Sequence, residues 1–103
     1  MVELLKKDNF DDKIRGKALI KFSARWCGSC TMMTPLFSEL SRELKGKADF
    51  FRVNFDDDNE IAERYSVENV PCIILLEDGV EKGRITGFQT KESLRNKIEG
   101  IIK

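Results

Sequence analysis

Histidine is absent from this chain, and cysteine, proline and tryptophan are scarce: the 103 residues include three cysteines, two prolines and one tryptophan. No apolar run approaches the roughly 18 residues that cross a bilayer. The 18 basic and 18 acidic residues cancel, so no basic surplus attracts nucleic acid or an anionic membrane. The length fits one domain around one core. We therefore expect a single domain over residues 1–103 that binds neither nucleic acid nor membrane.

The odd number of cysteines does not suggest a disulfide scaffold. Residues 1–7 also lack the basic segment and apolar core of a secretory signal. We expect a cytoplasmic protein, although a secreted product that had already lost its signal would show the same features. A zinc site needs four ligands, usually Cys or His, and the chain offers Cys27, Cys30 and Cys72 alone. We therefore expect no metal site.

Apolar periodicity and turn signals predict elements in the order β-α-β-α-β-α-β-β-α. The strands are expected at 2–6, 17–24, 48–55, 70–76 and 80–88. The helices are expected after a cap at Asp8, from 27 to about 45, around 61–65, and after a cap at Thr90. Both faces of 17–24 carry apolar residues, which predicts cover on both sides. The pattern indicates an α/β fold with a central mixed sheet and helices on both faces.

The sequence Trp26-Cys27-Gly28-Ser29-Cys30 lies directly after the second strand and directly before a helical pattern. Two thiols therefore lie at a helix N-terminus, where unpaired N–H groups and about half a positive charge favour a thiolate. The thiolate is the form of cysteine that attacks disulfides. The spacing also lets the second cysteine close a ring with the first. The motif predicts a reversible dithiol switch.

A Cys-x-x-Cys pair after a strand in a βαβ setting is typical of thioredoxin-like redox motifs. Other features at matching separations extend this match over essentially the whole length. They are Phe22, Ala24, Pro35, the run Val53-Asn54-Phe55-Asp56, Val70-Pro71, Asp78-Gly79 and Gly87. The chain therefore resembles the thioredoxin family. The resemblance implies the thioredoxin fold and a thiol–disulfide oxidoreductase that reduces protein disulfides.

The resemblance also implies roles for individual residues. Cys27 would be the nucleophile that forms a mixed disulfide with a substrate protein, and Cys30 would resolve it. Pro71 would be a cis-proline facing the thiols, and the backbone of Val70 would pair with the substrate strand. Further residues lining the same shallow groove would be Trp26, Gly28, Ser29, Gly87 and Phe88.

The partners implied are disulfide-containing substrate proteins and a separate thioredoxin reductase, either a flavoprotein or a ferredoxin-linked enzyme. We expect no cofactor in the chain itself, because it has no Gly-rich nucleotide loop. We also expect a monomer.

Two departures from the family pattern concern the chemistry. Ser29 replaces the usual proline between the cysteines and adds an N–H donor, which would raise the reduction potential by favouring the reduced form. Lys21 replaces a buried acid, and Arg52 matches the basic residue that often accompanies that acid. We therefore count Lys21 as a candidate catalytic residue that acts on Cys30 as a cation or, if desolvated, as a neutral amine base. The competing interpretation is that Lys21 extends to water and does no chemistry.

Other positions keep plainer interpretations. Cys72 is expected to be an inert buried residue, with a third redox thiol as the alternative. Met32 and Met33 are expected in the core, and the acidic run 56–58 is expected to be a solvated turn. Trp26 has a packing role as its alternative.

Two other functions remain open at this point: a more oxidising disulfide oxidase or isomerase, and a non-catalytic binding module. A binding module would keep its activity in Cys27→Ser, whereas an exchange enzyme would lose turnover.

Overall fold

The computed structural model describes residues 2–103, which form one mixed β-sheet with helices on both faces. The strands are β1 (Val2–Leu4), β2 (Lys17–Ser23), β3 (Asp49–Asn54), β4 (Cys72–Glu77) and β5 (Val80–Thr86). The helices are α1 (Phe10–Lys13), α2 (Gly28–Glu43), α3 (Asn59–Arg64) and α4 (Lys91–Ile102). This order confirms the predicted sequence of elements.

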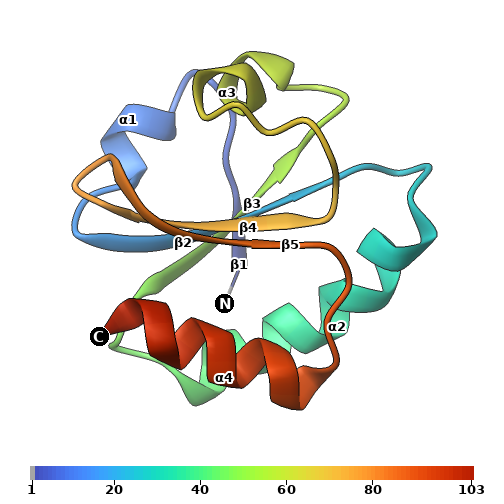
Figure 1. Cartoon of the computed structure of the whole chain (residues 1–103). Coiled ribbons are helices and arrows are strands. Elements are labelled where there is room, and N and C mark those ends of the chain that lie inside the picture. The colour runs from blue at the N-terminus through green and yellow to red at the C-terminus, as the bar shows by residue number, and fades with distance from the viewer. Residues whose placement is uncertain (1) are drawn as a thin grey trace.

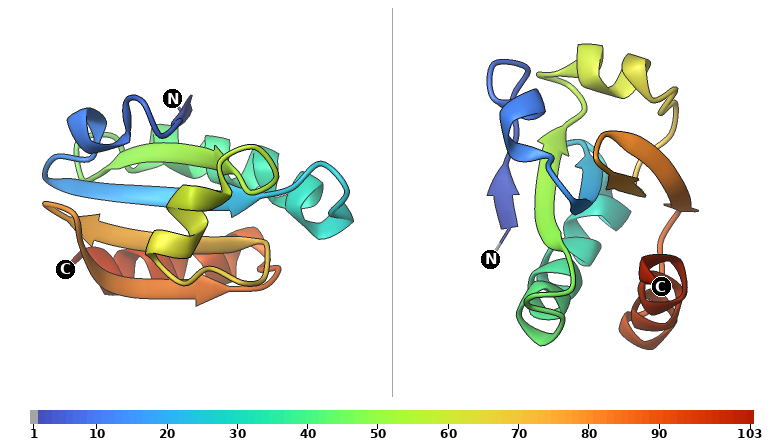
Figure 2. Two further views of the ribbon diagram at one scale, coloured as in Figure 1. Left: turned by 90° about the horizontal axis from the view of Figure 1, so that it is seen from above. Right: turned by 90° about the vertical axis from the view of Figure 1, so that its left-hand side faces the viewer.

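The five strands lie in the order β1-β3-β2-β4-β5. β1 and β2 both pair in parallel with β3, whereas β4 pairs antiparallel with β2 and with β5. Helices α1 and α3 cover one face of the sheet, and α2 and α4 cover the other (Figure 1). Figure 2 shows the same two layers from above and from the side. The expected helical layers on both faces are confirmed.

Strand β2 is the centre of the sheet and is buried on both sides. Ala18, Ile20 and Phe22 belong to the apolar cluster beneath α1 and α3, whereas Leu19 belongs to the cluster beneath α2 and α4. Lys21 shares the second face with Leu19, because alternate strand residues point to the same side. A lysine therefore lies within the row that packs against α2.

Local geometry departs from the prediction at the first helix. The sequence predicts Asp8 as the helix cap, which is wrong, because the N-cap of α1 is Asn9. The Asn9 Oδ1 atom accepts a hydrogen bond from the Lys6 N–H at 2.9 Å, so its side chain closes the preceding turn. The cap prediction at Thr90 is confirmed, since its side chain accepts a hydrogen bond from the Ser93 N–H.

The structure buries only one of the two methionines that are predicted in the core. Met33 is buried among the residues beneath α2, as expected. Met32 is 62% exposed, so its predicted core position is wrong. Consecutive helix residues are about 100° apart around the axis, which places only one of the two against the sheet.

The β4–β5 connection is the predicted hairpin. Asp78 has φ of 51° and Gly79 has φ of 85°, as a two-residue turn with both residues in the left-handed region requires. The turn returns β5 along β4 and brings Gly87, just beyond β5, next to Pro71.

Candidate active site

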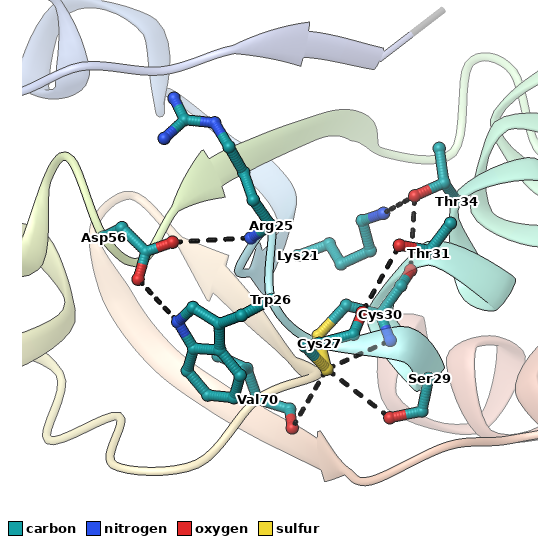
Figure 3. The surroundings of a disulfide bond; sticks show 10 residues. All are labelled: Lys21, Arg25, Trp26, Cys27, Ser29, Cys30, Thr31, Thr34, Asp56 and Val70. Carbon is teal, nitrogen blue, oxygen red and sulfur yellow. Dashed lines mark hydrogen bonds between the residues drawn. A yellow bond between two sulfur atoms is a disulfide. The ribbon is translucent and has the colours of Figure 1, made fainter.

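The cysteine pair lies at the first turn of α2 and is joined by a disulfide, with 5.2 Å between the two Cα atoms (Figure 3). Cys27 is the N-cap of α2, and its Sγ accepts a hydrogen bond from the Cys30 N–H at 3.2 Å. Cys27 is 7% exposed and Cys30 is 1% exposed. A sulfur at a helix N-cap receives N–H donation and the positive end of the helix dipole, and both favour a thiolate there after reduction.

Ser29 and Val70 lie against the sulfur of Cys27. The Ser29 Oγ is 3.5 Å from the Cys27 Sγ, and the hydroxyl is the donor because a disulfide sulfur carries no hydrogen. The Ser29 hydroxyl thus contacts this sulfur in addition to the backbone N–H that the sequence predicts as a donor. The Val70 carbonyl oxygen lies 3.8 Å from the same sulfur. The backbone of Val70, which is expected to pair with a substrate strand, therefore lies against the disulfide.

The Val70–Pro71 peptide bond is cis, as the family resemblance implies. The Gly87 N–H donates a hydrogen bond of 2.9 Å to the Pro71 carbonyl, which ties the end of β5 to this loop. Gly87 has φ of 82°, a conformation that disfavours other residues. Phe88 follows it and is exposed.

Gly28 borders open space, because a Cβ at this position would meet no atom within 4 Å beyond its chain neighbours. Contacts thus connect the start of α2 to the Val70–Pro71 loop, and that loop to the end of β5.

Trp26 is 71% exposed yet held in place, so the packing alternative is wrong. Its indole Nε1 donates a hydrogen bond of 2.9 Å to the Asp56 Oδ1, and the Arg25 N–H donates to the other oxygen of this carboxylate at 3.4 Å. Arg25 also forms a salt bridge of 2.7 Å with Asp57. Figure 3 shows Asp56 facing the segment that precedes the disulfide.

Sequence reasoning missed Asp56 as part of the site. The available signal was topological: Ser23 of β2 and Asn54 of β3 are register partners in a parallel pair. The segments that follow them therefore leave the sheet at the same edge. The sequence predicts a solvated turn at 56–58, whereas Asp56 accepts hydrogen bonds from Trp26 and Arg25.

Lys21 lies beneath the site and is 2% exposed, so the interpretation that it extends to water is wrong. Its Nζ donates a hydrogen bond of 3.0 Å to the Thr34 Oγ1, which in turn donates to the Cys30 carbonyl at 3.2 Å. Burial, and secondarily the charge of Arg52, lower the pKa of the Lys21 amine to about 8. Thr34 is a second residue that sequence reasoning missed.

Cys72 lies outside the disulfide pair and is buried in the apolar cluster that includes Phe22 and Ile74. Burial raises the pKa of its thiol, which disfavours the reactive thiolate. Within residues 2–103, His, Cys, Asp and Glu side chains form no group of three or more that could hold a metal ion.

Comparison with known proteins matches residues 1–100 to the family model described as Thioredoxin. The chain belongs to the thioredoxin family. It is 39% identical over 99 residues to a thioredoxin of Chlamydia pneumoniae, covering 95% of this chain and 96% of the relative. It is 36% identical over 92 residues to a thioredoxin of Staphylococcus aureus strain Mu50, covering 88% of each.

Membership of the thioredoxin family agrees with the sheet order, the cis Val70–Pro71 bond and the disulfide at the start of α2. The chain is thus a thiol–disulfide oxidoreductase of the protein-disulfide reductase kind, and Cys27–Cys30 is its redox-active disulfide. Membership of this family implies two kinds of partner, a reductase and disulfide-containing substrate proteins. None of the helices described over residues 2–103 could span a membrane.

Proposed function

We propose that Cys27 is the attacking nucleophile and that Cys30 resolves the intermediate during reduction of protein disulfides. The Cys27 thiolate attacks one substrate sulfur, the substrate disulfide breaks, and the other substrate sulfur leaves as a thiolate that takes a proton from solvent. Cys30 then loses its proton to solvent and attacks the Cys27 sulfur, which forms the Cys27–Cys30 disulfide. The second substrate sulfur leaves as a thiolate that also takes up a proton. The greater exposure of Cys27 supports this order of attack.

We propose that the substrate strand lies along the Val70–Pro71 loop. The Val70 carbonyl is 3.8 Å from the Cys27 sulfur, so a strand that pairs with this backbone presents its own disulfide to the nucleophile. Three of the expected lining residues add to this surface. Gly28 borders open space, the Phe88 ring is exposed, and the Trp26 indole is held by Asp56. Recognition by backbone and shape suits a reductant with many substrates.

We propose a monomer in the cytoplasm that is recharged by a separate reductase, either a flavoprotein or a ferredoxin-linked enzyme. The balanced charge of the chain supports a protein that binds neither nucleic acid nor anionic membranes. Incubating the oxidised protein with each class of reductase and its electron donor, then counting free thiols, identifies the class that recharges it.

The decisive experiment is reduction of insulin disulfides by the protein in the presence of a dithiol. The wild type is expected to accelerate turbidity, and Cys27→Ser is expected to abolish the acceleration. Cys30→Ser is expected to accumulate a mixed disulfide through Cys27, visible by mass spectrometry of the intact adduct. Cys72→Ala is the matched control and retains activity. An adduct through Cys30 in Cys27→Ser, with full activity, would contradict the assignment.

A second candidate, a more oxidising oxidase or isomerase, is favoured by two observations. The Ser29 hydroxyl lies 3.5 Å from the Cys27 sulfur, and Lys21 is a buried cationic group beneath Cys30. Both favour the reduced thiolate form, and stabilising the reduced form makes a stronger oxidant. Equilibration with a dithiol buffer decides between the candidates. A reduction potential at or below the cytosolic glutathione poise supports the reductant, and one well above it supports the oxidant.

A further inference from the structure

The bridge from Lys21 to Cys30 runs through one hydroxyl group. Thr34 lies one turn after Cys30 on α2 and is positioned to receive the Lys21 amine at 3.0 Å while donating to the Cys30 carbonyl at 3.2 Å. Figure 3 shows Lys21 directed at this first part of α2 rather than at the surface. The amine therefore has a fixed position relative to the disulfide.

Among residues 2–103, the Lys21 side chain has no anionic partner while the disulfide is intact. It makes none of the salt bridges found over residues 2–103. Its register neighbours are Arg52 on β3, which carries the same charge, and Ile73 on β4, which is apolar. From α2 the Phe37 ring approaches, with its centroid 5.8 Å from Nζ.

Reduction places the missing anion in this region. Cleavage of the Cys27–Cys30 bond leaves a thiolate at the N-terminus of α2. This same turn is linked to Lys21, because Thr34 bonds both the Lys21 amine and the Cys30 carbonyl. A negative charge close to a buried amine favours its protonated form. The gain is larger inside the protein than in water, because the low local dielectric screens the pair less.

We propose that reduction of the Cys27–Cys30 disulfide strengthens proton binding at the Lys21 amine, and that Thr34 is the positioning residue that holds the amine for this role. The proposal rests on the proposed dithiol chemistry of the pair and adds a proton-linked control of its redox equilibrium. The interaction is reciprocal, so a protonated Lys21 also favours the reduced pair.

The step balances with a dithiol as the reductant. The dithiol gives up two electrons and two protons and becomes a disulfide, while the Cys27–Cys30 bond breaks. One proton stays on the cysteine that becomes a thiol, and the other cysteine becomes the thiolate. The remaining proton binds the Lys21 amine when that amine was neutral before reduction, and otherwise passes to solvent.

The pH dependence follows from this balance. Below a pH of about 8, Lys21 is protonated in the oxidised protein, so reduction takes up no proton at the amine. The charge of Lys21 stabilises the reduced pair wherever the pH is high enough for the thiolate to form. Above this pH, each reduction takes up one proton at Lys21. The Lys21 contribution to the reduction equilibrium constant then falls about tenfold for each pH unit, until the amine is neutral in both states.

The test measures the equilibrium constant with reduced and oxidised dithiothreitol from pH 6 to pH 10. The quantity compared is the ratio of the wild-type constant to that of Lys21→Met. This ratio is expected to exceed one near a pH of about 8, where a thiolate and a protonated amine are both present, and to decline at higher pH. Thr34→Val is expected to move the break to lower pH, because the amine loses its hydrogen-bond acceptor. Lys17→Met removes a lysine from the same strand and is expected to leave the profile unchanged.

A measurement on the wild type makes the test independent of the variants. Carbon-13 NMR of the Lys21 Cε through a pH titration is expected to give a higher pKa in the reduced protein than in the oxidised one. Equal pKa values in the two states, or a wild-type to Lys21→Met ratio that is independent of pH, would overturn the proposal. Failure to reduce insulin would instead overturn the proposed function, because the dithiothreitol equilibrium requires no protein substrate.

Discussion

The indole of Trp26 and the carboxylate of Asp56 are joined by a hydrogen bond of 2.9 Å between Nε1 and Oδ1. The bond links the residue before Cys27 to the turn after β3, 30 positions away in sequence. An indole that is 71% exposed would otherwise sample several rotamers. The carboxylate therefore fixes one wall of the groove in which the substrate is proposed to lie.

Removing this carboxylate in Asp56→Ala should lower kcat/KM for insulin disulfide reduction by about fivefold, the rate equivalent of one hydrogen bond of about 1 kcal/mol. The indole loses its partner, so ordering Trp26 becomes a cost of substrate binding. The reduction potential should stay unchanged, since Asp56 forms no hydrogen bond with either sulfur.

Asp12→Ala is the matched control for this prediction, because it removes an exposed carboxylate on α1, away from the disulfide. An equal loss of kcat/KM in both variants would show that general surface charge, rather than the position of the indole, sets the rate.

The fold was predictable because its signals are local and repeated. Asp78-Gly79 specifies the hairpin by backbone conformation alone, and the apolar residues on both phases of β2 specify a strand covered on both sides. Side-chain contacts between segments distant in sequence are less visible. The N-cap of α1 is Asn9 rather than Asp8, and the Asn9 side chain accepts a hydrogen bond from the Lys6 N–H. Cap propensity alone does not distinguish these two neighbouring residues.

The redox chemistry of the site was predictable to the level of the Cys27–Cys30 pair, since the motif and its spacing carry that information. The partners Asp56 and Thr34 were not, because each acts through a contact set by packing. Thr34 carries a hydroxyl on the face of α2 that meets Lys21, and only the placement of α2 on the sheet shows this. Lys21 itself was visible as an anomaly in an apolar strand, but its burial required the structure.

Cys72 should resist alkylation in the native reduced protein. Burial raises the pKa of its thiol, so the fraction of thiolate at neutral pH falls, and the surrounding cluster excludes the reagent. Iodoacetamide at pH 7.5 is expected to label Cys27 first and to label Cys72 only after denaturation. Peptide mass mapping of samples quenched at successive times checks this order. Native labelling of Cys72 at a rate similar to that of Cys27 would contradict the inert assignment.

Glu43 should stabilise the packing of α4 against α2. It accepts a hydrogen bond of 2.8 Å from Lys91 and a further bond from Arg95, and the Lys91 and Arg95 hydrogen bonds lower the pKa of its carboxyl. A lowered carboxyl pKa contributes stability that is present above the ordinary pKa and lost as the pH falls through the lowered value.

The melting temperature of Glu43→Gln should be lower than that of the wild type by about 2 °C at pH 7 and low salt. The difference should shrink in molar salt, because the charges are exposed, and again as the pH falls well below 4.5. Glu68→Gln, in the loop after α3, is the control and should melt like the wild type. A difference that persists unchanged at low pH would point to packing rather than charge.

Lys21→Met should stabilise the oxidised protein at neutral pH. Burial lowers the pKa of the amine from 10.5 to about 8, so below pH 8 the folded state carries a charge that is less favourable there than in the unfolded chain. The cost is roughly 3 kcal/mol at pH 7. As the pH rises from about 8 towards 10.5, the unfolded state binds more protons at this residue than the folded state does, and the stability of the wild type rises by that amount.

The free energy of unfolding in urea, measured for both oxidised proteins at pH 7 and pH 10, checks the sign. Lys21→Met should be more stable than the wild type at pH 7, and the gap should narrow at pH 10 because only the wild type recovers the cost of burying this charge. Other lysines and the tyrosine titrate in both proteins and cancel in the difference. Lys17→Met on the same strand should show no such change with pH. A gap that is the same at both pH values would mean that Met fills space better than Lys, and that the charge of Lys21 costs nothing in the fold.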